Sequence, residues 1–248
     1  MTEPRLTIVT VCFNCVTDIE ETIKSVVAQK EYGIEYIVVD GASKDGTTEI
    51  IRKYIGTIDT FICEPDKGIY DAMNKGIMAA TGQWIYFLNA GDILCDGGLK
   101  AVPFAICVTD DNLCGIIGKI KVCRHGTLYE HCVGKPFFEV QKKFKNMGFS
   151  HQGVFIKTVL AKENPFDTSY RLCADYDMMV RLYNKGYRFE RIEEYIAIIK
   201  GDDGTTARNR KQQLLEEGRV CGCDKDFSFK MLVAWRSLKM FLHKVLKR

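Results

Sequence analysis

The chain has 248 residues, of which 46% are hydrophobic and 27% charged. This length and composition suit one sizeable α/β domain and exclude a disordered chain. The formal net charge of +3, from 35 basic and 32 acidic residues, excludes a strongly basic nucleic-acid-binding protein. Residues 225–248 hold seven basic residues and one acid, so the first 224 residues carry 28 basic and 31 acidic side chains. An acidic body is therefore followed by a cationic tail.

The first 98 residues alternate between predicted strands and predicted helices. Continuous β-branched segments predict strands, and apolar residues at helical spacing predict helices. We expect Thr17 or Asp18 to cap the first helix and Gly82 to close the third. The expected strands are 6–13, 35–40, 60–66 and 83–92, and the expected helices are 17–29, 45–55 and 68–82. This alternation predicts βαβ units and a mostly parallel, Rossmann-like sheet flanked by helices.

The second half of the chain is less regular. Residues 114–123 and 126–133 predict a hairpin or part of a mixed sheet, and 150–162 begins as a strand. Residues 174–186 predict a helix that ends at Gly186, and 201–210 predicts a mobile loop. An internal boundary near Asp92–Gly98 is expected, with one sheet crossing it.

The eleven cysteines are scattered along the chain. Cys12 and Cys15 have C-x-x-C spacing, but no second Cys or His pair completes a zinc-finger pattern. The start of the chain lacks the basic, apolar and small-residue regions of a secretory leader, and no apolar segment of about 18 residues predicts a spanning helix. We therefore interpret the cysteines as reduced apolar fillers and expect a cytoplasmic protein.

Polar side chains follow three strands of the predicted parallel sheet. Asn14, Asp40 and Asp92 stand at strand ends, where open α/β sheets bind ligands, although each alone is a common turn former. The segment GASKDGTT has P-loop spacing, but Thr47 replaces the phosphate-binding Lys, and no G-x-G-x-x-G occurs. A nucleotide diphosphate beside carboxylates needs a hard cation, so Asp92 is the candidate ligand for Mg²⁺ or Mn²⁺.

Five motifs in order carry a resemblance to a known family. The chain resembles the family-two inverting glycosyltransferases with the GT-A fold, closest to the colanic-acid and capsule polysaccharide type of bacterial enzyme. The motifs are TIVTVCFN, EYIVVDGASKDGT, EPDKGIYDAMNKG, ATG and FLNAGD, extended by SHQGVFIK and ADYDMMVRLYNKGYRF. The resemblance implies one GT-A domain over 1–224, with a nucleotide-sugar half (1–98), an acceptor half (99–224), and a basic amphipathic helix over 225–248.

The resemblance also implies roles for residues around the donor. Asp40 matches the acid that binds the base, usually uracil, and Asp92 matches the last acid of the metal-binding D-x-D element. The first acid of that element is missing, because Asn89, Ala90 and Gly91 precede Asp92. The other donor-site positions are Phe13, Asn14, Asp66 and Asn74.

The acceptor half supplies the expected base. Asp175 matches the aspartate of the family's Glu-Asp pair, with Ala174 in place of the glutamate and Asp177 as the fallback. Without the resemblance, Asp175 is a simple N-terminal helix acid. The candidates for acceptor or phosphate contact are His151, Gln152 and Arg208, the last in a loop able to close over a donor.

The tail combines apolar and cationic helical stripes. Met231, Trp235, Leu238, Leu242 and Val245 form one stripe, and Arg236, Lys239, His243 and Lys247 form the other. This pattern favours peripheral contact with an anionic membrane surface, and the alternative is packing on the domain or in a homodimer.

The resemblance, taken with these features, implies transfer of a sugar from a UDP-sugar to a hydroxyl of a bacterial, lipid-linked surface or capsular glycan. An inverting transfer is one in-line displacement that needs a base on the acceptor and charge neutralisation on the leaving diphosphate. One alternative is a nucleotide-sugar-binding module without turnover. A sugar nucleotidyltransferase is a weaker alternative, since no Gly-rich basic segment follows the first strand.

Overall fold

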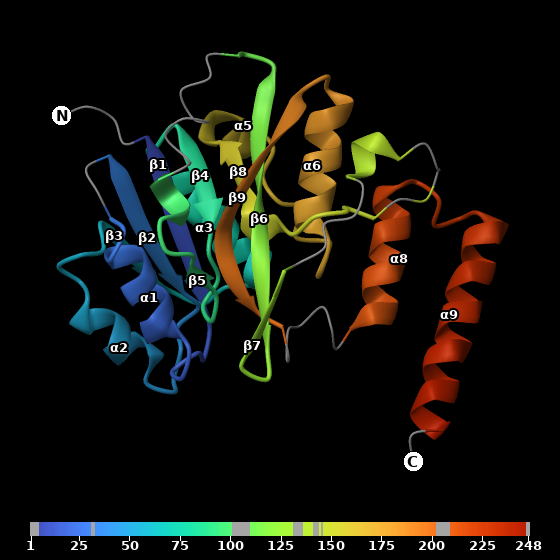
Figure 1. Cartoon of the computed structure of the whole chain (residues 1–248), viewed down its shortest axis with the longest axis horizontal. Helices are drawn as coiled ribbons and strands as arrows, with labels where there is room; N and C mark the ends of the chain where they lie inside the picture. The colour runs from blue at the N-terminus through green and yellow to red at the C-terminus, as the bar shows by residue number, and fades with distance from the viewer. Residues whose placement is uncertain are drawn as a thin grey trace.

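The computed structural model describes residues 5–30, 33–100, 110–130, 136–140, 144, 146–201 and 209–246, with the side chains of the last helix described as far as Lys239. Its described strands form one sheet in the order β3-β2-β1-β4-β8-β6-β9-β5, with β7 paired to β6 (Figure 1). The strands are β1 (Leu6–Cys12), β2 (Ile34–Asp40), β3 (Thr60–Cys63), β4 (Trp84–Phe87), β5 (Ile93–Leu94), β6 (Leu113–Arg124), β7 (Thr127–Glu130), β8 (Val154–Lys157) and β9 (Arg188–Lys200).

The first four strands in this order are parallel, and the second half of the sheet is mixed. β3, β2, β1 and β4 are parallel neighbours, whereas β8 is antiparallel to both β4 and β6. β9 runs parallel to β6 and antiparallel to β5. The sheet is thus continuous from the first half of the chain into the second. The carboxyl ends of β1, β2 and β4 lie at one edge, as the alternating pattern predicted.

Helices cover both faces of the sheet, which explains why every residue of β1 is buried. On one face, α1 (Ile19–Val27) and α2 (Thr47–Lys53) pack with Ile19, Ile23 and Ile51 against the sheet. The other face is covered by α3 (Ile69–Ala79), α5 (Thr158–Glu163) and α6 (Ala174–Asn184). The predicted buried face of α6 is confirmed, since Met178, Met179 and Leu182 all lie in that core.

Two further helices stand beyond the sheet, at the end of the molecule opposite α1 and α2 (Figure 1). α8 (Arg210–Val220) and α9 (Phe227–Leu246) enclose a small apolar cluster of Leu214, Cys223, Phe229 and Val233. Gly218 permits this contact, because a Cβ at that position would come within 2.1 Å of the Phe229 ring. A larger residue at 218 would therefore push the two helices apart.

Several local expectations were wrong. Asp18 occupies the N-cap position of α1 but makes no side-chain cap; it accepts hydrogen bonds from Thr17 Oγ1 (3.0 Å) and Lys200 Nζ (2.5 Å) instead. α3 ends at Ala79 rather than at Gly82, where a Cβ would lie 2.7 Å from Thr7 N. Gly82 is thus needed for close strand packing and not for a left-handed cap.

Candidate active site

The loops that follow β1 and β2 are joined by hydrogen bonds. Asn14 N donates to Ser43 Oγ (2.8 Å), and Lys44 N donates to Asn14 Oδ1 (3.0 Å). Asn14 and Ala42 both have positive φ angles, of 51° and 61°. Such conformations are costly for residues other than glycine, and they concentrate at ligand sites.

Asp40 ends β2 and is fully buried beneath these loops. Its Oδ1 accepts from Ser43 N (3.1 Å) and Ser43 Oγ, and its Oδ2 accepts from Thr48 Oγ1 and weakly from Cys63 Sγ (3.7 Å). The carboxylate therefore holds the Gly41–Ser43 turn against α2. A direct contact with a nucleotide base would require one of these donors to move.

Phe13, Gly41 and Asp66 lie close together beside the end of β2. A Cβ on Gly41 would lie 2.3 Å from Asp66 Oδ2 and 3.2 Å from Phe13 Cδ2. Phe13 is 58% exposed. Asp66 Oδ1 accepts from Gly68 N (2.9 Å), which leaves the carboxylate between the Gly41 turn and the start of α3. Phe13, Gly41 and Asp66 thus lie next to one another beside the carboxyl end of β2.

Asn74, the other residue expected around the donor, is hydrogen-bonded to the backbone of Phe166. Its Nδ2 donates to Phe166 O and its Oδ1 accepts from Phe166 N, both at 2.9 Å. The carboxamide is therefore committed to holding the segment before α6 against α3.

Asp92 lies in the turn after β4 and is buried. Its Oδ1 accepts from Lys200 N at 3.3 Å. Burial raises the pKa of Asp92 to about 6, against opposing effects of Lys200 N, His151 and Gln152. In the same turn, the buried Asn89 Oδ1 has no hydrogen-bond partner among the described residues. The turn thus contains a buried carboxylate and a buried amide oxygen.

His151 and Asp175 form a pair in the second half of the site. His151 Nδ1 lies 2.9 Å from Asp175 Oδ2, and Tyr70 OH donates to Asp175 Oδ1 at 3.0 Å. Burial alone would raise the pKa of Asp175, but His151, the backbone and Tyr70 outweigh it and hold that pKa below its usual range. Burial alone would lower the pKa of His151, but Asp175 and Asp92 hold it above the usual value.

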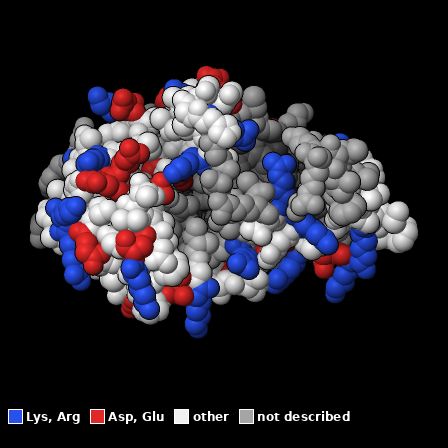
Figure 2. All heavy atoms as spheres, turned by 90° about the horizontal axis from the view of Figure 1, so that it is seen from below, with Lys and Arg blue, Asp and Glu red and all other residues white. Residues whose placement is uncertain are grey.

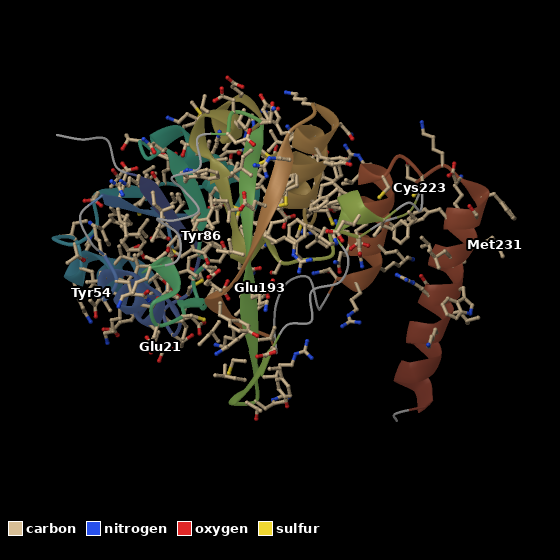
Figure 3. All side chains as sticks on the ribbon, turned by 45° about the horizontal axis from the view of Figure 1, so that its top comes forward. Glu21, Tyr54, Tyr86, Glu193, Cys223 and Met231 are labelled. Atoms are coloured by element: carbon tan, nitrogen blue, oxygen red, sulfur yellow. The ribbon has the colours of Figure 1, made fainter. Side chains whose placement is uncertain are left out.

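The pair reaches the Asp92 turn through Asn89, whose Nδ2 lies 3.4 Å from His151 Nε2. His151 begins a short 3-10 turn, η3 (His151–Gly153), that is held by Tyr86 OH donating to Gln152 O at 2.6 Å. Tyr86 is a fully buried residue of β4 and is labelled in Figure 3. Side chains from β4, α3, η3 and α6 thus converge next to the strand ends.

The structure brings the predicted residues into two adjoining groups. Phe13, Asn14, Asp40 and Asp66 lie around the loops after β1 and β2, and Asp92, His151, Gln152 and Asp175 lie beside β4. Arg208 lies outside the described residues. Sequence reasoning missed Tyr70 and gave Asn89 no role. Tyr70 was visible inside the motif GIYDAMNKG, but its partner Asp175 is far away in the chain.

Among the residues that the structure describes, no three His, Cys, Asp or Glu side chains are grouped to hold a metal ion. Asp177, the fallback base, pairs through its Oδ2 with Arg181 Nε at 2.7 Å. No helix within the described ranges combines the length and apolar character that a membrane span requires.

This arrangement of sheet, helices and strand-end loops defines a GT-A-like α/β fold. TarS of S. aureus (residues 1–349), solved in complex with UDP-GlcNAc, superposes with a TM-score of 0.70 over 89% of this chain and 66% of its own, at 16% identity. The mannosyltransferase PcManGT of Pyrobaculum calidifontis, solved with GDP-Man and Mn²⁺, gives a TM-score of 0.65 over 89% of this chain and 64% of its own, at 19% identity. At such identities the likeness concerns the fold alone.

The chain belongs to glycosyl transferase family 2, whose family model matches residues 7–158. A PGL/p-HBAD biosynthesis glycosyltransferase of Mycobacterium bovis is 24% identical over 188 residues, which cover 74% of this chain and 72% of the relative. The uncharacterized glycosyltransferase Rv1514c of Mycobacterium tuberculosis is 39% identical over 90 residues. That match spans 36% of this chain and about a third (34%) of the relative.

Proposed function

We propose that the protein is an inverting glycosyltransferase that moves a sugar from a UDP-sugar to a hydroxyl of a bacterial surface or capsular glycan. The observation that carries the proposal is the placement of the His151–Asp175 pair beside Asp92 at the carboxyl edge of the sheet. A histidine–aspartate pair and a separate buried carboxylate suit the two needs of the reaction, which are a base and neutralisation of the leaving diphosphate.

The donor would occupy the loops after β1 and β2. Phe13 offers an exposed ring on which a base can stack, and Asp66 offers carboxylate oxygens beside it. Asp40 supports Phe13 and Asp66 by fixing the Gly41–Ser43 turn beside them. We assign the same supporting role to Asn14, which ties the two loops together, and to Asn74, which fixes α3.

The turn of Asp92 fits a divalent cation, Mn²⁺ or Mg²⁺. Burial disfavours the charged form of Asp92, and a cation would offset that cost. The unpartnered Asn89 Oδ1 is a second hard oxygen in the same turn, and diphosphate oxygens would complete the coordination. Such an ion neutralises charge on the leaving group.

Asp175 supplies the base function. Its low pKa keeps it ionised at neutral pH, and His151 and Tyr70 fix its orientation. The acceptor oxygen bonds to the anomeric carbon as its proton leaves for the base. The bond from that carbon to the diphosphate breaks, and its electron pair departs with the nucleotide.

One observation favours a second candidate, a nucleotide-sugar-binding module without turnover. Asp92 is the sole carboxylate of its turn, because Asn89, Ala90 and Gly91 precede it and the first acid of the resembling motif is missing. Weak metal affinity would leave donor binding intact and slow the transfer.

A thermal-shift panel of nucleotides and nucleotide sugars, with and without Mn²⁺, tests the proposal. A ligand present at 100 times its Kd stabilises the folded state by about 2.7 kcal/mol. We expect UDP and a UDP-sugar to raise Tm and Gly41→Val to remove the shift, because its side chain would fill the space against Asp66 and Phe13. Donor turnover in the presence of an acceptor distinguishes the enzyme from the binding module. A panel without any nucleotide-dependent shift would contradict both.

We propose that α9 holds the enzyme at the inner face of the cytoplasmic membrane, where a lipid-linked acceptor lies. α9 packs on α8 through Phe229 and Val233, and this leaves the described part of the predicted apolar stripe, Met231, Trp235 and Leu238, facing outward. The side chains of Leu242 and Val245 lie outside the described ones. Met231 points away from the domain (Figure 3), and its side chain is 56% exposed, with Trp235 at 59% and Leu238 at 57%. The exposed stripe favours a surface contact over packing on the same chain.

The charge around α9 supports an anionic partner surface. Lys230, Arg236 and Lys239 are exposed, and Lys239 Nζ lies 5.6 Å from the centre of the Trp235 ring. Figure 2 shows basic side chains predominating over the end that contains α8 and α9, whereas both signs mix over the opposite end. Exposed aromatic and apolar residues with adjacent lysines suit the interface of an anionic bilayer.

The fluorescence of Trp235 can test whether α9 binds a membrane surface. In a Trp84→Phe variant, Trp235 is the remaining tryptophan, and we expect its emission to shift to the blue with phosphatidylglycerol vesicles and to return at high salt. Met231→Ser/Leu238→Ser should weaken vesicle binding at least about tenfold, since each buried apolar side chain contributes about 1.5–3 kcal/mol. Phosphatidylcholine vesicles are the control. Concentration-dependent dimers without any vesicle binding would instead assign the stripe to a homodimer.

A further inference from the structure

Glu216 of α8 is a buried carboxylate that binds the backbone in front of α6. Its Oε2 accepts from Leu172 N (2.8 Å), Cys173 N (3.1 Å) and Arg171 N (3.2 Å). Its Oε1 accepts from Gln212 Nε2 (3.0 Å) and also lies 3.2 Å from Arg171 N. One side chain thus engages three consecutive N–H groups from a distant part of the chain.

These N–H groups stand directly before the helix that carries Asp175. α6 begins at Ala174, so Asp175 is its second residue, and Cys173 O accepts the first-turn bond from Asp177 N at 2.9 Å. The first turn of a helix has no internal partners for its N–H groups, and its position depends on what binds the adjacent backbone. Glu216 therefore fixes the segment from which Asp175 projects.

The position of α8 is fixed in turn from both sides. Tyr176 OH lies 3.4 Å from Cys221 Sγ, which joins α6 to the end of α8. On its other side, Gly218 receives the Phe229 ring of α9. Cys223, at the turn between α8 and α9, is labelled in Figure 3. Glu216 thus connects an anchored helix pair to the candidate base.

We propose that Glu216 is a positioning residue for Asp175, holding the 171–173 backbone so that Asp175 meets both His151 and the acceptor. The part concerning the acceptor rests on the proposed function, and the part concerning the His151 contact does not. A misplacement of about 1 Å caused by a distant mutation can slow a reaction about 10²-fold. The geometry therefore predicts a loss of rate without a loss of donor binding.

The test compares Glu216→Ala and Glu216→Gln with a matched control, Glu35→Ala. Glu35 also accepts from one backbone N–H and two hydroxyls, of Thr81 and Thr7, but at the opposite end of β2. The NMR resonance of the His151 Nδ1 proton reports the contact with Asp175, because a proton held against a carboxylate oxygen 2.9 Å from the nitrogen exchanges slowly with water. Transfer assays and UDP affinity are measured on the same proteins.

In Glu216→Ala we expect the resonance of the His151 Nδ1 proton to move or to be lost through exchange with water, kcat to fall at least tenfold, and the Kd for UDP to stay within twofold. Glu216→Gln keeps one acceptor oxygen and should give an intermediate change in that resonance, which tests the proposal if the alanine variant does not fold. Glu35→Ala should lower Tm and leave the His151 resonance, kcat and UDP affinity unchanged. An unchanged His151 resonance and kcat in a folded Glu216 variant would overturn the proposal. If the wild type transfers no sugar but the His151 resonance changes in Glu216→Ala, the proposed function is refuted and the positioning role is retained.

Discussion

The Asp175→Asn variant is expected to bind UDP like the wild type and to transfer sugar about 10²–10⁴-fold more slowly, which is the usual contribution of a general base. Asparagine retains an acceptor for Tyr70 OH but cannot take the acceptor proton, and it removes the negative charge that faces His151. The measurement is kcat for transfer, together with a UDP titration on the same preparation. A rate within twofold of the wild type would remove Asp175 from the mechanism.

Asp177→Asn is the matched control for that experiment. Asp177 lies two residues along the same helix, but its carboxylate pairs with Arg181 at 2.7 Å and does not contact His151. We expect this variant to keep its rate and to lose at most the small stabilisation of a helical ion pair, about 0.3–0.5 kcal/mol. If Asp177→Asn loses activity and Asp175→Asn does not, the base is Asp177.

Asp92→Ala is expected to abolish the Mn²⁺ dependence of transfer and to lower kcat about 10²–10³-fold, the scale associated with loss of one electrostatic contact to a developing charge. Burial disfavours the Asp92 carboxylate in the free protein, so its removal should leave Tm at pH 7 unchanged or higher. The measurements are kcat against Mn²⁺ concentration and Tm with and without Mn²⁺ plus UDP.

Asp59→Asn serves as the control for Asp92. Asp59 Oδ2 accepts from Tyr36 N (2.6 Å) and from Lys30 Nζ (2.6 Å), far from the strand ends that form the site. Its replacement should lower Tm and leave the metal response intact. Mn²⁺-stimulated transfer that persists at the wild-type level in Asp92→Ala would exclude Asp92 as a metal ligand.

The parallel half of the fold was predictable because its signals are local. The β-branched strands, the helical periodicity of 68–82 and the turn residues at Asp40–Gly41 each report on their own neighbourhood. The second half was predicted less well. α5 was missed, and β9, whose exposed residues obscure any alternation, pairs with β6 across more than sixty residues of chain. α8 was also missed, because its polar sequence shows little helical periodicity.

Residue types at strand ends pointed to the candidate site, and the resemblance suggested roles for them. Asp40, Asp92, His151 and Asp175 could all be named without coordinates. Their partners could not, since the hydrogen bond from Tyr70 to Asp175 joins α3 to α6 and the hydrogen bonds to Glu216 join α8 to the segment before α6. Sequence spacing carries no information on such contacts between distant elements.

The structure explains the difference in charge between residues 1–224 and residues 225–248. The sequence by itself determined an acidic α/β body, a cationic amphipathic tail and the strand-end polar residues, because composition and periodicity are local properties. Only the tertiary structure decided which side of the tail is free, since Phe229 and Val233 turn inward and Met231, Trp235 and Leu238 turn outward. It also decided that Asp175 is buried between His151 and Tyr70, because burial and pairing depend on how distant segments pack.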